Sequence, residues 1–179
     1  MATQLSLFSP SSTKPAAKNT TRSATSGLSV FVDGAARGNP GPAGAGIFIT
    51  QDKTTVLAEG LFLGKKTNNQ AEYLALLLAI FFIEKLIKDG AIAHQPIRFF
   101  SDSELLVKQM NGVYQVKNEQ LKALHGIIRQ HLTKHHATFT HVLRAKNADA
   151  DALANLGVDH KKKVPTAFSK ILADYGLHL

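Results

Sequence analysis

The spacing of apolar and polar positions predicts strands first, then alternating strands and helices. Three short runs rich in β-branched and aromatic residues predict an antiparallel meander over residues 28–33, 45–50 and 56–63. Residues 71–88 are apolar nearly all round, which is typical of a central buried helix. Later helices are predicted at 101–110, 119–132, 148–156 and 167–175, and later strands at 97–100 and 138–143. The order βββαβαβα predicts an α/β fold with a five-stranded mixed sheet flanked by helices, because helical crossovers imply parallel neighbours.

Three parts are expected along the chain. Residues 1–27 contain eleven Ser or Thr, three basic residues and no acid, so we expect a flexible tail. Residues 28–157 are expected to form one domain, since no internal repeat divides them. Residues 158–179 are expected to form a basic extension with a short helix, in which 161–163 serve as a solvated hinge or extend a nucleic-acid track.

The net charge and the absence of cysteine reduce the number of possible functions. The net charge of +8 favours a polyanionic partner, which charge alone leaves as nucleic acid or an anionic membrane surface. Zero Cys excludes disulfides, zinc–thiolate sites and a Cys nucleophile. The longest apolar run, 74–83, is too short to cross a bilayer, so no membrane partner is expected.

Four carboxylates fall at ends of predicted elements. Asp33 ends the first strand, Glu72 lies in the first turn of the buried helix, Asp102 follows the fourth strand, and Asp151 begins the helix after the fifth. Taken singly, each suits turn formation or the helix dipole. If the first and fourth strands are neighbours, all four meet at one sheet edge, and converging carboxylates repel one another unless a cation lies among them. Oxygen ligands favour Mg²⁺ or Mn²⁺, and two such ions about 4 Å apart can promote phosphodiester hydrolysis.

Four sequence blocks containing these acids resemble the signature of type 1 ribonuclease H. The blocks are 33–44 (DGAARGNPGPAG), 67–72 (TNNQAE), 101–103 (SDS) and 147–155 (NADADALAN). The resemblance covers about residues 28–157 and implies the ribonuclease H-like fold. It also implies endonucleolytic hydrolysis of the RNA strand of RNA–DNA hybrids left by priming, transcription or R-loops, giving 5′-phosphate and 3′-hydroxyl ends. The four acids would be catalytic ligands of two Mg²⁺ ions, with Mn²⁺ as a substitute, and Asp33 would bridge both.

Asp151 has an acidic neighbour, Asp149, two positions earlier in the same predicted helix. The family pattern places its carboxylate at Asp151, and the two side chains are offset by about 200° around a helix. Asp149 is therefore expected to have no catalytic role.

Substrate contacts are expected from polar side chains and glycines in the same blocks. Reading 2′-hydroxyl groups in a shallow minor groove suits small polar groups and backbone. The expected contacts are Gly34, Arg37, Gly38, Asn39, Asn68, Asn69, Gln70, Ser103 and Arg144. Capping of the following helix is the alternative for Asn68 and for Ser103. Arg37, Lys65, Lys66, Lys108 and Lys117 are candidate partners of DNA phosphates, with solvated surface charge as the alternative.

The chain departs from many bacterial members at two places. The segment between the last strand and helix is too short for the flexible loop that carries a histidine, so His141 is expected to be structural and Arg144 or Lys146 to supply the charge. Residues 111–118 replace a longer basic protrusion, which marks the short form of the family. His135 and His136 are interpreted as a solvated turn with no metal site.

The N-terminal segment Gln4-Leu5-Ser6-Leu7-Phe8 resembles the peptide by which bacterial proteins dock on the DNA sliding clamp. Gln4, Leu5, Leu7 and Phe8 would be the anchors. A transit peptide for organelle import and an inert linker are the alternatives.

The sequence thus favours a monomeric, cytoplasmic ribonuclease H. One alternative is another nuclease of the same fold, such as a junction-directed Holliday-junction resolvase or a reverse-transcriptase appendage. The other is a non-catalytic nucleic-acid-binding protein of the same fold. A non-catalytic module would be expected to lack at least one of the four carboxylates, and none is missing.

Overall fold

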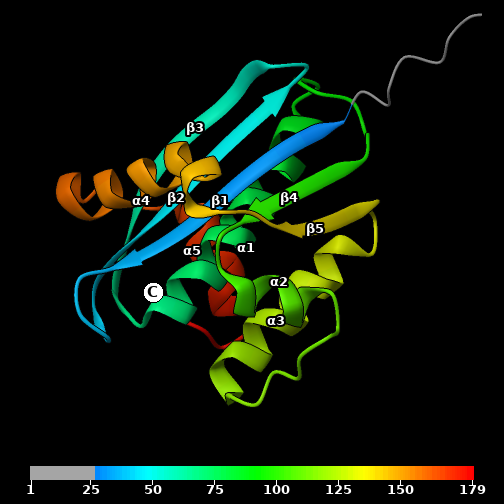
Figure 1. The fold of residues 1–179 in the computed structure, drawn as a ribbon. Coiled ribbons are helices and arrows are strands. Elements are labelled where there is room, and N and C mark those ends of the chain that lie inside the picture. The colour runs from blue at the N-terminus through cyan, green and yellow to red at the C-terminus, as the bar shows by residue number, and fades with distance from the viewer. Residues whose placement is uncertain (1–26) are drawn as a thin grey trace, which may run out of the picture.

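The computed structural model describes residues 27–179, which form a five-stranded sheet with helices on both faces (Figure 1). The strands are β1 (Leu28–Ala36), β2 (Gly41–Gln51), β3 (Thr54–Lys66), β4 (Ile97–Ser101) and β5 (Ala137–His141). Their order across the sheet is β3-β2-β1-β4-β5. Strands β1 to β3 pair antiparallel, whereas β1, β4 and β5 are parallel, which confirms the predicted mixed sheet.

The helices divide between the two faces of the sheet (Figure 1). Helix α4 (Ala148–His160) lies across β1, β2 and β3 on one face. On the other face α1 (Asn68–Lys88) packs on β1 and β2, and α3 (Glu119–Leu132) packs on α1. Helix α2 (Glu104–Met110) follows β4, a 3-10 turn η1 (Arg144–Lys146) follows β5, and α5 (Thr166–Asp174) closes the chain. Within residues 27–179 no helix is long and apolar enough to cross a membrane.

Helix α1 begins three residues before its predicted start. Thr67 is the N-cap: its hydroxyl accepts from the Gln70 N–H at 3.3 Å, and its own N–H donates to Gln70 Oε1 at 2.8 Å. This reciprocal capping box satisfies N–H groups that a helix start leaves unpaired. Asn68 is consequently the first helical residue and not the cap, which corrects the capping alternative given for it.

The segment after α4 is packed on the domain and does not form a solvated hinge. Helix α4 runs three residues past the expected boundary at 157, and Lys161 ends it in a left-handed conformation with φ of 50°. The Phe62 N–H donates to the Lys162 carbonyl at 2.7 Å, and the Lys162 ammonium pairs with Glu59. The backbone of residues 161–163 therefore lies along the edge of β3 and is hydrogen-bonded to it. The charge of the lysine side chains does not predict this contact.

Helix α5 contributes to the core beneath α1. Phe168 and Leu172 are fully buried, and the Phe168 ring meets Phe81 edge to face with 5.7 Å between centroids. Truncating a buried phenylalanine leaves a cavity and costs about 3–5 kcal/mol. We expect Phe168→Ala to lower the free energy of unfolding by that amount in urea denaturation. Lys170→Ala, at an exposed position of the same helix, is the control and should change it by less than about 0.5 kcal/mol. Equal stability of the two variants would show that α5 is not part of the core.

Candidate active site

Gly34 brings the carboxylates of β1 and α1 together. A Cβ at Gly34 would lie 2.1 Å from the backbone nitrogen of Glu72, so only glycine lets the start of α1 lie this close to β1. Asp33 precedes this contact on β1, and Glu72 lies across it on α1. Gly34, expected as a substrate contact, is thus a buried close-packing residue.

A second glycine positions Asp151. A Cβ at Gly46 would lie 1.9 Å from the carbonyl oxygen of Ala150, so the backbone of α4 rests directly on β2 at this point. Gly46 is also the antiparallel partner of Asp33 on β1. The close approach at Gly46 therefore places Asp151, the next residue of α4, beside Asp33.

Asp102 joins the group because β4 runs parallel to β1, and Asn147 holds it there. The Asn147 Nδ2 donates to Asp102 Oδ1 at 2.8 Å and to the Val32 carbonyl at 3.0 Å. Asn147 is only 1% exposed and occupies the N-cap position of α4, but its side chain makes no capping hydrogen bond to this helix. Its side chain instead ties together β1, the end of β4 and the start of α4.

The carboxylates interact electrostatically across this edge of the sheet. Burial, together with the nearby charges of Asp102 and Asp151, raises the pKa of Asp33 to about 7 against the opposing charge of Arg144. Burial also raises the pKa of Glu72 well above its ordinary value, with Asp33 and Asp102 adding to the effect. This is the behaviour expected of carboxylates gathered without a compensating cation.

The donor set fits a hard divalent cation in its chemistry. All four groups are carboxylates, and Glu72 Oε2 is buried with no hydrogen-bond partner among residues 27–179. In the conformation observed, however, no three acidic or histidine side chains of residues 27–179 are grouped closely enough to hold an ion. Arg144 Nη2 lies 2.5 Å from Asp151 Oδ1, and Asn147 Nδ2 donates to Asp102 Oδ1. A bound cation would therefore compete with Arg144 for Asp151 and with Asn147 for Asp102.

The comparisons with known proteins agree with this arrangement. Residues 31–157 match the family model described as "Reverse transcriptase-like". The chain is 30% identical over 149 residues to a ribonuclease H of Nitrosomonas eutropha, covering 74% of this chain and 90% of that protein. The chain belongs to the type 1 ribonuclease H family. Its fold is also similar to that of LC11-RNase H1 solved with an RNA/DNA hybrid, at a TM-score of 0.68 and 39% identity, covering 74% of this chain and 97% of that one.

A further relative of this ribonuclease H chain is longer than the chain itself. Ribonuclease HI of Halobacterium salinarum is 38% identical over 131 residues, which is 72% of this chain. The chain spans 63% of the length of that relative. The family match ends at residue 157, so α5 and the segment after it lie outside it.

The ribonuclease H domain gathers its expected substrate-binding amides at the start of α1. The Asn68 N–H donates to Asn39 Oδ1 at 3.2 Å, which links the β1–β2 turn to this helix. Asn39, Asn69 and Gln70 line a shallow hollow of about 240 Å³. Gln70 is only partly free, because its Oε1 accepts from the Thr67 N–H and its Nε2 donates to Gln120 Oε1 at 2.6 Å.

The remaining candidate contacts are more dispersed. Gly38 has a φ of 98° and turns the chain ahead of Asn39. Ser103, next to Asp102, caps α2 by accepting from the Leu106 N–H at 3.4 Å. Arg37 pairs with Asp159 near the far end of α4, at 2.5 Å.

Among the candidate phosphate partners, Lys108 is paired with Glu104 at 2.6 Å and donates to the Tyr114 hydroxyl at 3.0 Å. Lys66 is partly buried, whereas Lys65 and Lys117 are exposed. Exposed Lys65 and Lys117 are therefore the freer candidates for a DNA phosphate.

The histidines fall into two groups. His141 is exposed on β5, with Nε2 at 3.2 Å from the Asp102 carbonyl oxygen. The interpretation of His135 as part of a solvated turn is wrong: its side chain is only 3% exposed, stacks on His94 and faces Glu84, which also contacts His131 Nδ1 at 3.0 Å. Burial lowers the pKa of His135.

Sequence reasoning missed the positioning role of Asn147 and the two close-packing glycines. Gly34 and Gly46 could have been suspected, because a glycine inside a strand often marks a site where another backbone approaches closely. The clamp-binding anchors Gln4, Leu5, Leu7 and Phe8 lie outside the described residues.

Proposed function

We propose that this chain hydrolyses the RNA strand of RNA–DNA hybrids with divalent cations. The observation that carries the proposal is the convergence of Asp33, Glu72, Asp102 and Asp151 at one edge of a ribonuclease H fold. The relatives named ribonuclease H and the related fold solved with an RNA/DNA hybrid support it.

The four carboxylates would hold two Mg²⁺ ions, or Mn²⁺ in their place. When bound, the cations supply Lewis-acid activation of water and neutralise charge on the scissile phosphate. The chain supplies oxygen ligands, and repulsion among them is relieved by the ions. Gly34 and Gly46 fix the backbone spacing, and Asn147 orients Asp102. The expected products carry 5′-phosphate and 3′-hydroxyl ends.

The amide side chains provide a physical basis for choosing RNA. Asn39 and Asn69 border a shallow polar hollow at the start of α1, the helix that carries Glu72, and 2′-hydroxyl groups both donate and accept hydrogen bonds. A DNA strand lacks these groups and would leave the amides without partners. Lys65 and Lys117 would contact phosphates of the paired DNA strand, so binding should weaken as salt rises.

Arg144 places a positively charged guanidinium beside the four carboxylates. Its side chain is 76% exposed yet lies 2.5 Å from Asp151 Oδ1, and its charge lowers the pKa of Asp33. We expect Arg144→Ala to lower kcat at least about ten-fold, because charge developing near the carboxylates loses a stabilising partner. Arg144→Lys should recover part of the rate, and Arg98→Ala, at an exposed arginine that donates to Ser29, should leave it unchanged. An unchanged kcat for Arg144→Ala would reject this role.

A substrate comparison tests the proposed activity. A labelled RNA–DNA hybrid, an RNA duplex and a DNA duplex of one sequence are incubated with the chain and Mg²⁺. We expect internal cuts in the RNA strand of the hybrid only. Cleavage of the DNA duplex at a similar rate, or no cleavage of the hybrid, would contradict the proposal.

The N-terminal segment is proposed to recruit the chain to a DNA sliding clamp. A peptide with two apolar anchors and a glutamine can fill a preformed pocket, and tethering raises the effective concentration of the enzyme on DNA. A labelled peptide of residues 1–10 is expected to bind a bacterial sliding clamp and to be displaced by a known clamp ligand. A peptide in which Leu7 and Phe8 are alanine is the control. Failure of the natural peptide to compete would end this proposal.

A further inference from the structure

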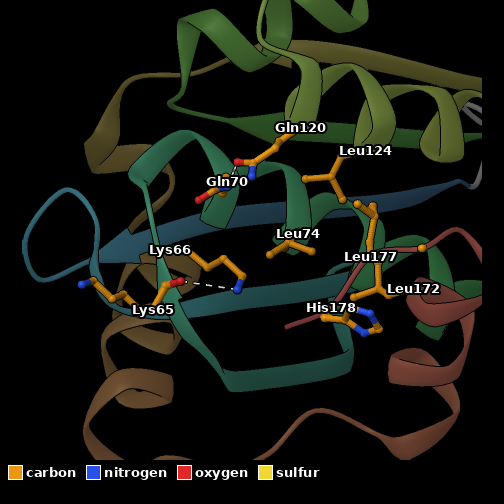
Figure 2. Close-up of a pocket in the computed structure, with 10 residues that line it drawn as sticks. Lys65, Lys66, Gln70, Leu74, Gln120, Leu124, Leu172, Leu177 and His178 are labelled. Atoms are coloured by element: carbon orange, nitrogen blue, oxygen red, sulfur yellow. Dashed lines mark hydrogen bonds between the residues drawn. The ribbon is translucent and has the colours of Figure 1, made fainter.

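A second pocket lies apart from the carboxylates, where the ribonuclease H domain meets the C-terminal segment (Figure 2). Its volume is about 370 Å³, within the range of about 300–1,000 Å³ that is usual for small-molecule sites. The end of β3, α1, α3 and residues 172–178 each contribute to its lining. Because residues after 157 lie outside the family match, the pocket is not a feature of the matched domain alone.

The body of the pocket is apolar. Four leucines line it, one each from α1, α3, α5 and the C-terminal segment: Leu74, Leu124, Leu172 and Leu177. In Figure 2 they group on one side of the opening. Leu74, Leu124 and Leu172 are buried, whereas Leu177 is partly exposed, so the Leu177 side chain is the one that suits the flat face of a ring system, which gains by leaving water.

Lys66 places a cation against this apolar surface. In Figure 2 its side chain points toward Leu74, whereas the Lys65 side chain runs the opposite way. The Lys66 ammonium donates to the Lys65 carbonyl at 3.4 Å, and within residues 27–179 no carboxylate pairs with it. Desolvation by burial lowers the pKa of Lys66. His178 also lines the pocket and lies below Leu172 in Figure 2, so it offers an anionic group a second nitrogen partner.

An amide pair forms the opposite end. Gln70 Nε2 donates to Gln120 Oε1 at 2.6 Å, and Gln70 Oε1 accepts from the Thr67 N–H at 2.8 Å. The Gln120 amide nitrogen has no hydrogen-bond partner among residues 27–179 and can donate to a ligand. Figure 2 shows this pair on the far side of the leucines from His178. The pocket therefore offers a cationic end, an apolar middle and a hydrogen-bonding end.

We propose that this pocket binds a 5′-phosphorylated nucleoside. The phosphate would pair with Lys66 and His178, the base would lie on Leu177, and the edge of the base would accept from Gln120. A fatty acid would leave the amide end without a polar partner, and inorganic phosphate would leave Leu177 uncovered. A free mononucleotide and the terminal nucleotide of a nucleic-acid strand share this chemistry.

Calorimetric titration of the full chain tests the site. AMP, GMP, CMP, UMP and inorganic phosphate are titrated separately at low salt in EDTA, which removes metal-dependent binding at the carboxylates. We expect at least one nucleotide to bind saturably with one site per chain and at least ten-fold more tightly than phosphate. Saturable binding of none of the four nucleotides would overturn the proposal.

Variants locate the binding in this pocket. Lys66→Met keeps the alkyl stem and Gln120→Leu keeps the bulk, and each should weaken nucleotide binding at least ten-fold. Lys170→Met, at an exposed position of α5, should leave binding unchanged. Asp33→Asn should also leave it unchanged, which separates this site from the proposed catalytic centre. Wild-type affinity in both Lys66→Met and Gln120→Leu would overturn the assignment.

The two sources of the ligand are separated by a second arm. Hybrids with a blunt end or with one unpaired 5′-phosphorylated nucleotide are compared for binding in EDTA. Tighter binding of the overhang, lost in Lys66→Met, identifies a strand terminus as the ligand. Equal binding of the two hybrids, together with nucleotide binding, identifies a free mononucleotide.

Discussion

Asp33→Asn is expected to abolish hybrid cleavage while making the cation-free protein more stable at alkaline pH. Asp33 is 6% exposed and is proposed to bridge both cations, so its loss should reduce kcat at least about a thousand-fold, or about 4 kcal/mol of transition-state stabilisation. The stability gain comes from removing a buried charge that Asp102 and Asp151 repel.

The pH dependence of this stability effect follows from the raised pKa. Asp33 has a pKa of about 7 in the folded chain against an ordinary pKa of 3.8, so the folded state binds its proton more tightly. Its contribution to stability is therefore complete below about pH 4 and is lost as the pH rises through 7. Three pKa units correspond to about 4 kcal/mol, so Asp33→Asn should raise the free energy of unfolding by about 2–4 kcal/mol at pH 8 and little at pH 4.

Urea denaturation in EDTA at both pH values measures this difference. Asp149→Asn is the control, because Asp149 is exposed and is not among the charged groups that shift the pKa of Asp33. An Asp33→Asn protein as unstable as the wild type at pH 8 would show that the carboxylates do not repel one another as described.

The second large effect separates Asp151 from Asp149. Both lie in the first turn of α4, so each interacts similarly with the helix dipole, a contribution of about 0.3–1 kcal/mol. Only Asp151 faces Asp33 and pairs with Arg144. We expect Asp151→Asn to lower kcat at least about a hundred-fold and Asp149→Asn to change it by less than about three-fold.

Steady-state cleavage of one hybrid by both variants provides the comparison. Circular dichroism melting should give the two variants similar helical content, so that a loss of rate reflects chemistry. Equal losses from the two substitutions would remove Asp151 from the proposed centre.

Much of the fold was accessible from the sequence because its patterns are local. The apolar run of 71–88 and the 3.6-residue period of 119–132 predicted α1 and α3, with α3 correct at both ends. The mixed sheet followed from the helical crossovers and is confirmed. The sequence left open whether the first and fourth strands are neighbours, and the structure shows that β1 and β4 pair in parallel, on which convergence of the carboxylates depends.

What the sequence did not reveal depends on distant contacts. Asn147 precedes a helix and so resembles a cap, but its side-chain nitrogen donates instead to a carbonyl 115 positions away and to Asp102. His135 resembled a solvated turn because its covering partners, Glu84 and His94, come from elsewhere in the chain. The lysines after α4 resembled a hinge because their side chains are charged and polar. What holds this segment is the backbone hydrogen bond between Phe62 and Lys162, which the residue types do not predict.

The most direct test of the central claim is the cation dependence of hybrid cleavage by the unmodified chain. The protein is dialysed against EDTA, and cleavage of a labelled RNA–DNA hybrid is followed before and after addition of Mg²⁺ or Mn²⁺. The four-carboxylate centre predicts no cleavage in EDTA and recovery of RNA cutting, with 5′-phosphate products, once the cation is restored. Undiminished cleavage in EDTA would contradict it.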